Sequence, residues 1–234
     1  MPDTAATVQR VEWDAFVASL DWQQGEHVTL VGPTGLGKTH LALELLRYRE
    51  DRDAHIAILA NKPRDATMEK MQRRGYKIVS EWGRVPPRAR RVVLWPRFRG
   101  PGDIPVQAAT FREALGEIFS SQGWCVYVDE APWFVDNLKL DDWLTVIWQQ
   151  GRSLGLSLVT SMQRPRFVPL VAFSSATHLF LYRTSDAEDL KRLAGLGVAD
   201  TTTIRTVVAG LDKFDVLYVN TRTGHLAVTR APKR

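Results

Sequence analysis

The residues with the clearest chemical meaning form one glycine-rich stretch behind a short apolar run, 28–31. The stretch contains Gly32, Pro33, Thr34, Gly35, Leu36, Gly37, Lys38, Thr39 and, opening the helical run, His40. It has the G-x-x-x-x-G-K-[ST] spacing of a nucleoside-triphosphate P-loop between a strand and a helix. Loop N–H groups at a helix N-terminus face phosphates, Lys38 reaches the β- and γ-phosphates, and Thr39 ligates Mg²⁺. The sequence therefore predicts nucleotide binding here, in preference to a plain glycine turn.

A pair of acids follows a second buried strand, 124–128. This apolar run ends directly in Asp129 and Glu130. Because the carboxyl ends of strands gather at one edge of such a sheet, we expect Asp129 to lie beside Thr39 and to hold Mg²⁺. Glu130 would then orient and deprotonate the attacking water. The alternative interpretation is a solvated strand end without a role.

Two further polar residues follow in the chain. Gln163 closes the next strand, 156–161, which we expect between the P-loop strand and the strand ending in Asp129. There Gln163 would sense the γ-phosphate, unless it is only a turn residue. Arg152 follows a helix, and an arginine on such a loop can reach a neighbouring subunit's site as a finger. Arg164 and Arg166 are competitors for that role, and a surface arginine is the alternative.

Elements that position these residues alternate between strand and helix, which predicts an α/β fold. We expect a P-loop NTPase of the ASCE or RecA-like kind, with a mostly parallel central sheet flanked by helices. A C-terminal β-hairpin should turn at residues 223–224. One domain is predicted, comprising a helical lead-in (1–25), a nucleotide-binding core (26–165) and a C-terminal completion of the sheet (166–234). Helices are expected at 11–20, 65–74, 107–119, 136–150, 185–193 (closed by Gly195) and 201–209.

Composition narrows the setting. The 234 residues carry a formal net charge of +5 and one cysteine, Cys125, so neither a disulfide framework nor a cysteine-built zinc site is expected. No apolar run resembles a signal peptide or a membrane span, so we expect a cytoplasmic protein without membrane insertion. A dense basic region could contact a phosphate backbone or form a solvated face. Its members are Arg84, Arg88, Arg90, Arg91, Arg97 and Arg99.

Three segments together resemble the FtsK/HerA superfamily of DNA-translocating ATPases. They are 128–131, 151–156 and 160–165, with a Gly-Arg-x-x-Gly-Leu element and a strand-terminal glutamine. The resemblance implies a ring-forming homo-oligomer that uses ATP and Mg²⁺ to move double-stranded DNA. It also implies that Arg152 acts in trans and that Gln163 is the sensor. The compact chain favours a small viral-type packaging ATPase in the host cytoplasm, or a soluble translocase, working with a portal or another motor protein.

Two alternatives come from other functional classes. The run 129–134, Asp-Glu-Ala-Pro-Trp-Phe, is similar to a segment of thymidine kinases, which would make the chain a P-loop nucleoside kinase. Such kinases build a zinc lobe from cysteines, and the 151–165 signature has no place in them. The second alternative is a nucleotide switch or loader that acts on a protein partner, with slow hydrolysis that DNA does not change.

Overall fold

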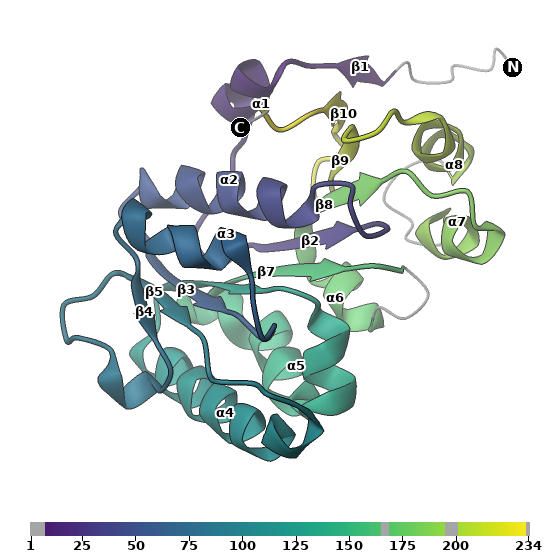
Figure 1. Cartoon of the computed structure of the whole chain (residues 1–234). Coiled ribbons are helices and arrows are strands. Elements are labelled where there is room, and N and C mark those ends of the chain that lie inside the picture. The colour runs from purple at the N-terminus through teal and green to yellow at the C-terminus, as the bar shows by residue number, and fades with distance from the viewer. Residues whose placement is uncertain (1–7, 165–168, 195–200, 233–234) are drawn as a thin grey trace, which may run out of the picture. The chain divides into compact units, whose positions relative to one another are not determined.

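The computed structural model describes residues 8–164, 169–194 and 201–232 (Figure 1). Within these ranges, ten strands form a mixed, mostly parallel sheet in the order β1-β10-β9-β8-β2-β7-β6-β3-β5-β4. This confirms the predicted α/β class. The strands are β1 (Gln9–Arg10), β2 (His27–Val31), β3 (His55–Leu59), β4 (Lys77–Val79), β5 (Arg91–Leu94), β6 (Trp124–Val128), β7 (Ser157–Met162), β8 (Ala176–Tyr182), β9 (Val216–Asn220) and β10 (Leu226–Thr229).

Helices separate most of the parallel strands. They are α1 (Trp13–Ser19), α2 (Lys38–Glu50), α3 (Ala66–Glu69), α4 (Ile104–Ser121), α5 (Asp141–Gln150), α6 (Leu170–Ser174), α7 (Ala187–Ala194) and α8 (Thr201–Gly210). Of these described helices, none is both long enough and apolar enough to cross a bilayer.

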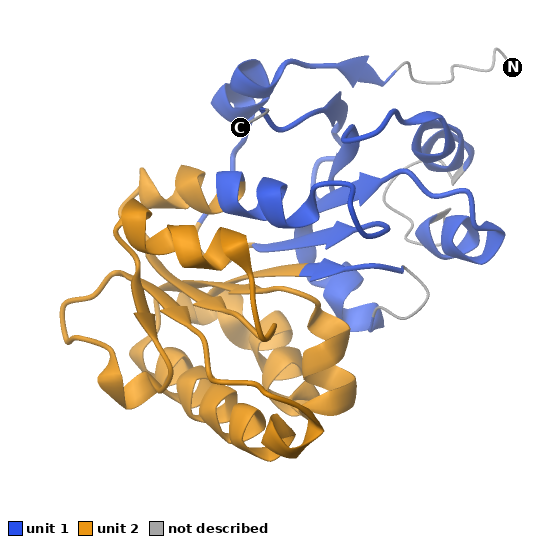
Figure 2. Cartoon of the chain, viewed as in Figure 1, with its two compact units in different colours: residues 1–23, 27–44, 161–234 blue, residues 24–26, 45–160 orange. Residues whose placement is uncertain are grey.

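The chain divides into two compact units that interleave in sequence (Figure 2). Unit 1 contains residues 1–23, 27–44 and 161–234, and unit 2 contains residues 24–26 and 45–160. Helix α2 and strand β7 each begin in one unit and end in the other. The single-domain organisation expected from the sequence stays a prediction.

Unit 1 combines a parallel strand pair with an antiparallel meander. Strand β2 pairs in parallel with β8, while β8, β9 and β10 are antiparallel neighbours. The β9–β10 hairpin confirms the predicted C-terminal turn. Helix α1 buries Phe16 against this sheet, with its ring 4.9 Å from that of Tyr218 and 6.0 Å from that of Phe180. Packing these three aromatic rings together adds to this unit's hydrophobic stabilisation.

Unit 2 is a parallel sheet in the order β7-β6-β3-β5-β4. Helices α4 and α5 lie on one side of these strands and α3 lies on the other (Figure 1). All five residues of β6 are buried, as are four of the five in β3. Such continuous apolar runs are what a parallel sheet covered on both faces requires.

The predicted helices differ from the observed ones mainly at their ends. The helix expected at 136–150 begins at Asp141, because Lys139 adopts a left-handed φ of 53° that no α-helix interior tolerates. A short π-helix, Trp133–Asn137, precedes it. The helix expected at 65–74 is α3 followed by a 3₁₀ turn, which Gly75 closes. Gly195 lies outside the described residues. The short elements β1 and α6 were not expected.

Candidate nucleotide site

The P-loop leaves β2 at Gly32 and enters α2 at Lys38, so the predicted order of strand, loop and helix is present and the helix begins two residues before His40. Its tightest point is Gly32, where a Cβ would lie 2.4 Å from the Tyr182 Cβ, so no other residue fits without moving β8. Gly35 and Gly37 have φ values of 82° and 95°, which favour glycine. The loop conformation therefore depends on the glycines of the motif.

Lys38 folds back over its own loop. Its ammonium donates to Gly32 O at 2.7 Å and to Pro33 O at 3.0 Å, and the residue is only 8% exposed. Thr39 lies half-buried in the first turn of α2. His40 is turned towards the chain's C-terminal segment, where its Nε2 lies 2.6 Å from Pro232 O and must act as the donor. His40 is therefore engaged by a protein carbonyl in this structure.

A cavity of about 480 Å³ opens beside the P-loop within unit 1. Pro33, Thr34 and Leu36 line one wall, and Gln163 lines another. The backbone explains this placement, because Gly32 N donates to Met162 O at 3.1 Å and Gln163 follows directly. The structure thus brings Gln163 to the P-loop. Its sensor role stays a prediction.

The same cavity contains residues that the sequence interpretation missed. Arg183, Thr184 and Ser185 line it directly after β8, which runs parallel to β2. The signal was available, since a polar Arg-Thr-Ser run follows a buried strand at the edge where strand carboxyl ends gather. Arg164 also lines the cavity and is ion-paired with Asp186 and, at 3.2 Å, with Asp189.

In unit 2 the predicted acids stand at the carboxyl end of β6. Asp129 is 6% exposed and accepts from the Tyr127 hydroxyl at 3.0 Å. Lys62 donates to its other oxygen, Oδ2, at 2.5 Å. Lys62 was not among the residues singled out in the sequence. Its signal is that it follows β3, the parallel neighbour of β6.

Glu130 adopts a left-handed backbone, with φ of 59°, and is half-buried. A non-glycine residue in this region is strained, and such strain collects at functional sites. The next turn starts at once, since Trp133 N donates to Glu130 O at 2.9 Å. The backbone therefore turns sharply at the acid pair, and Glu130 does not have the extended conformation of a strand residue.

Arg152 is exposed on a tightly held turn of unit 2. Gly155 closes this turn in the left-handed region, and its carbonyl accepts from the Gln24 side chain at 2.5 Å. Gly25 packs on the Arg152 backbone, and a Cβ there would meet Arg152 O at 2.8 Å. A fixed backbone with an exposed guanidinium suits an arginine that reaches outward.

Local carboxylates neutralise much of the predicted basic region. Arg84 pairs with Glu81 at 3.1 Å, Arg90 with Asp53 at 3.0 Å, and Arg91 with Glu50 at 3.6 Å. These contacts favour the solvated-face alternative for the three arginines. The two exposed pairs, Arg84–Glu81 and Arg90–Asp53, add little stability, typically below about 1 kcal/mol.

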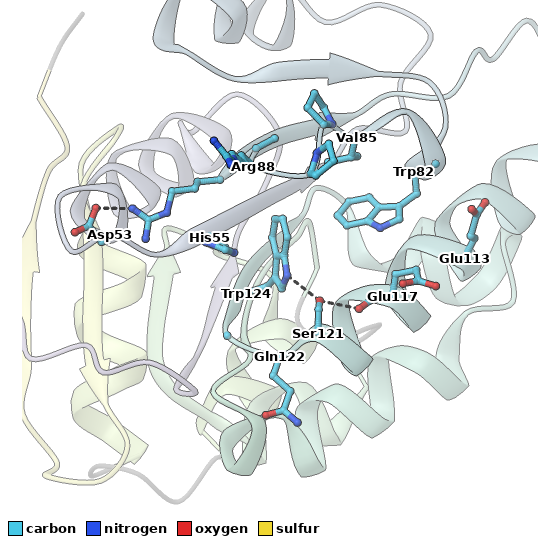
Figure 3. Close-up of a pocket in the computed structure, with 16 residues that line it drawn as sticks. Asp53, His55, Trp82, Val85, Arg88, Glu113, Glu117, Ser121, Gln122 and Trp124 are labelled. Carbon is cyan, nitrogen blue, oxygen red and sulfur yellow. Dashed lines mark hydrogen bonds and ion pairs between the residues drawn. The ribbon is translucent and has the colours of Figure 1, made fainter.

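A second hollow, of about 980 Å³, lies at the amino end of β3 and β6 (Figure 3). Trp82 and Trp124 meet edge to face at 5.5 Å, with Glu113 and Glu117 on the Trp82 side. Arg88 lies on the opposite side. The hollow includes neither Asp129 nor Glu130, which stand at the other end of β6, so it is separate from the acid pair.

Comparison with known proteins gives a likeness in fold. No protein-family model and no curated protein matches the sequence. The genome-packaging NTPase B204 of Sulfolobus turreted icosahedral virus 2, in complex with AMPPCP, aligns at a TM-score of 0.67 and 13% identity, over 90% of this chain and all of B204. VirB4 of Thermoanaerobacter pseudethanolicus aligns at 0.69 and 10% identity, over 89% of each chain.

A third solved structure, the pCW3 conjugation coupling protein TcpA with ATPγS, aligns at a TM-score of 0.57 and 14% identity. This chain is 91% covered and spans 61% of TcpA. This chain thus has the fold of these solved structures, which agrees with the architecture that the predicted resemblance implies.

Proposed function

We propose that this chain is an ATP-hydrolysing motor that translocates or packages double-stranded DNA as a ring oligomer. The observation that carries the proposal is the P-loop, intact in sequence and backbone, on a fold that covers the whole of a nucleotide-bound packaging NTPase. At this level of identity the comparison supports the architecture, and the activity is inferred from the site residues.

Residues 32–40 would hold the triphosphate, with Lys38 turning from its loop carbonyls towards the phosphates. A phosphate oxygen carries negative charge and is a stronger partner for an ammonium than a backbone carbonyl. Thr39 and Asp129 are the residues we assign to Mg²⁺. A hydroxyl and a buried carboxylate are oxygen ligands of the kind that suits this ion. When bound, the ion supplies charge neutralisation between phosphate oxygens.

Glu130 is assigned as the base that orients and deprotonates the attacking water. Its left-handed backbone sets it apart from Asp129, which points at Lys62 and Tyr127. The two adjacent acids thereby take different roles. Gln163, on the cavity wall beside the P-loop, is assigned as the sensor of the γ-phosphate.

Arg152 is our assignment for the trans-acting arginine. It is exposed on a rigid turn, whereas its competitor Arg164 is held in cis by Asp186 and Asp189. A guanidinium bound to two carboxylates has to break both ion pairs before it can serve another subunit. Arg166, the other competitor, lies outside the described residues. A portal or other motor protein as partner, and a cytoplasmic location, complete the proposal.

The testing experiment measures ATP hydrolysis with and without long double-stranded DNA. Lys38→Ala should abolish turnover, while Arg73→Ala, an exposed arginine in unit 2, should match the parent. Arg152→Ala and Glu130→Gln should each be inactive alone. Mixed, they should regain activity, because one subunit supplies Glu130 and its neighbour supplies Arg152.

Two results would contradict the proposal. Turnover unchanged by DNA, together with consumption of the γ-phosphate by a nucleoside, would indicate the kinase alternative. Slow hydrolysis that DNA leaves unchanged, with no rescue in the mixture, would indicate a switch or loader.

A further inference from the structure

We propose that Lys62 is a positioning residue for Asp129, serving as a resident counter-ion that a divalent cation must displace. The proposal rests on the assignment of Asp129 as a metal ligand. It adds a residue that neither the P-loop motif nor the acid pair includes. Lys62 would set the metal concentration at which the site fills.

The contact is short and specific. Lys62 Nζ lies 2.5 Å from Asp129 Oδ2, and the Tyr127 hydroxyl lies 3.0 Å from Oδ1. Asp129 has a side chain that is 8% exposed, whereas that of Lys62 is 47% exposed. A buried carboxylate needs a compensating charge, and in this structure the ammonium supplies one. A divalent metal ion held by Asp129 would supply positive charge to the same carboxylate.

Hydrogen bonds hold the backbone at Lys62 and at the preceding Asn61. Lys62 O accepts from the Trp95 indole at 2.6 Å, and Asn61 Nδ2 donates to Asp129 O at 3.3 Å. Gln107 in turn donates to Asn61 O at 3.0 Å. The following Pro63 restricts the Lys62 backbone further. The hydrogen-bonded backbone therefore directs the Lys62 ammonium towards Asp129.

A second carboxylate stands ready to receive the displaced ammonium. Asp65 Oδ2 lies 3.9 Å from Lys62 Nζ. The other oxygen of Asp65, Oδ1, accepts from Thr67 N at 2.8 Å and from Met68 N at 3.2 Å, which caps α3 and fixes the carboxylate. Lys62 can thus exchange Asp129 for Asp65 by a side-chain rotation. The exchange keeps the ammonium paired and leaves Asp129 to the incoming cation.

The charges of Lys62 and Asp65 predict in which direction each residue changes the affinity for a divalent cation. An ammonium and a divalent cation at the same carboxylate repel each other, so removing the ammonium should strengthen cation binding. Asp65 should favour cation binding because it draws the ammonium away. The two residues therefore act in opposite senses, and the effect of Asp65 should pass through Lys62.

The test measures Mn²⁺ binding by electron paramagnetic resonance, with a non-hydrolysable ATP analogue present. Lys62→Met should bind Mn²⁺ about tenfold more tightly than the parent, and Lys62→Arg, which keeps the charge, should match the parent. Lys70→Met, an exposed lysine of the same unit, is the control. Without metal, Lys62→Met should melt several degrees lower than the parent, and Mn²⁺ should restore its melting temperature.

A second variant keeps the proposal falsifiable if Lys62→Met does not fold. Asp65→Asn retains the cap and should bind Mn²⁺ more weakly than the parent. An arginine at position 62 could still exchange between the two carboxylates, so Lys62→Arg is not suitable for this comparison. The decisive double-mutant cycle therefore combines Asp65→Asn with Lys62→Gln. In that background Asp65→Asn should change Mn²⁺ binding little.

Failure of this inference and failure of the proposed function give different results. If Asp129→Asn weakens Mn²⁺ binding but folded Lys62→Met binds like the parent or more weakly, only the counter-ion role is wrong. If Asp129→Asn leaves Mn²⁺ binding unchanged, the metal-ligand assignment is wrong and the counter-ion role falls with it.

Discussion

The P-loop of unit 1 and the end of β6 in unit 2 each hold a lysine, but by different chemistry. Within its own unit, Lys38 donates to the backbone carbonyls of Gly32 and Pro33. Lys62 donates to a carboxylate, that of Asp129. Carbonyl dipoles orient an ammonium without cancelling its charge, whereas a carboxylate neutralises it. The first arrangement suits a lysine that binds an anion, and the second suits a lysine that must be exchanged for another cation.

The largest effect should come from removing the lysine of the first arrangement. Lys38→Ala should lower the ATP turnover rate by at least about 100-fold, because a positioned cationic donor to developing phosphate charge is lost. Lys77→Ala, on the exposed side of β4, should match the parent in the same assay. A Lys38→Ala variant with parental turnover would remove the P-loop from the reaction.

A second prediction separates the two acids that follow β6. Glu130→Gln should lower turnover about 100-fold, since the base is lost, while nucleotide affinity stays at the parental value. Asp129→Asn should instead weaken nucleotide binding in the presence of Mg²⁺. Turnover rates and titration with a fluorescent nucleotide would check this. Equal loss of affinity in both variants would show that the acids share one role.

Unit 1 also contains a buried carboxylate that is neutralised by cationic side chains. The free energy of unfolding can show how much such a pairing stabilises the fold. Asp215 is buried, with Arg10 at 2.6 Å and Arg230 at 2.6 Å. Burial raises the pKa of Asp215, but hydrogen bonds from Arg10 and Arg230 outweigh it and hold the pKa below its usual range. Asp215→Asn should lower the free energy of unfolding by about 2 kcal/mol at pH 7.

The pH dependence of that loss has a definite sign. Because the folded-state pKa is depressed, the carboxylate stabilises the fold fully above its unfolded pKa, about 3.9. That contribution disappears as the pH falls through the folded-state value. Urea unfolding of parent and Asp215→Asn should therefore differ most at neutral pH and converge in acid. A difference that grows below pH 4 would contradict the ion-pair account.

The smallest expected effect concerns the cap beside Lys62. Asp65→Ala removes the acceptor for Thr67 N and Met68 N and should cost about 1 kcal/mol of unfolding free energy. Asp65→Asn, which keeps a capping oxygen, should cost much less. Thermal or urea unfolding would measure both, and equal losses would show that the charge of Asp65, not its cap, is what stabilises this segment.

The P-loop was predictable because its geometry is local. Strand, glycines, lysine and helix follow one another within about a dozen residues, and the backbone observed at Gly32 to Lys38 is what the motif requires. The position of Gln163 beside the loop also followed from the alternation of strands and helices. Both inferences needed only neighbours in sequence or the general rule for strand ends.

Lys62 was not predictable in the same way. Its role depends on β3 becoming the neighbour of β6, and pairing between distant segments cannot be read from local periodicity. The predicted start of α5 was wrong because Lys139 adopts a left-handed backbone conformation, which the residue types there do not indicate. The ion pairs of the basic region could likewise not be predicted, because they depend on which carboxylates lie beside the arginines.

The backbone at Gly25 limits which amino acids this position can accept. Its φ of 89° and the 2.8 Å approach to Arg152 O leave no room for a side chain, although the residue lies outside every recognised motif. In a saturation library selected for function, position 25 should therefore tolerate almost nothing but glycine. A lineage that lost this glycine would have to rebuild the turn that carries Arg152.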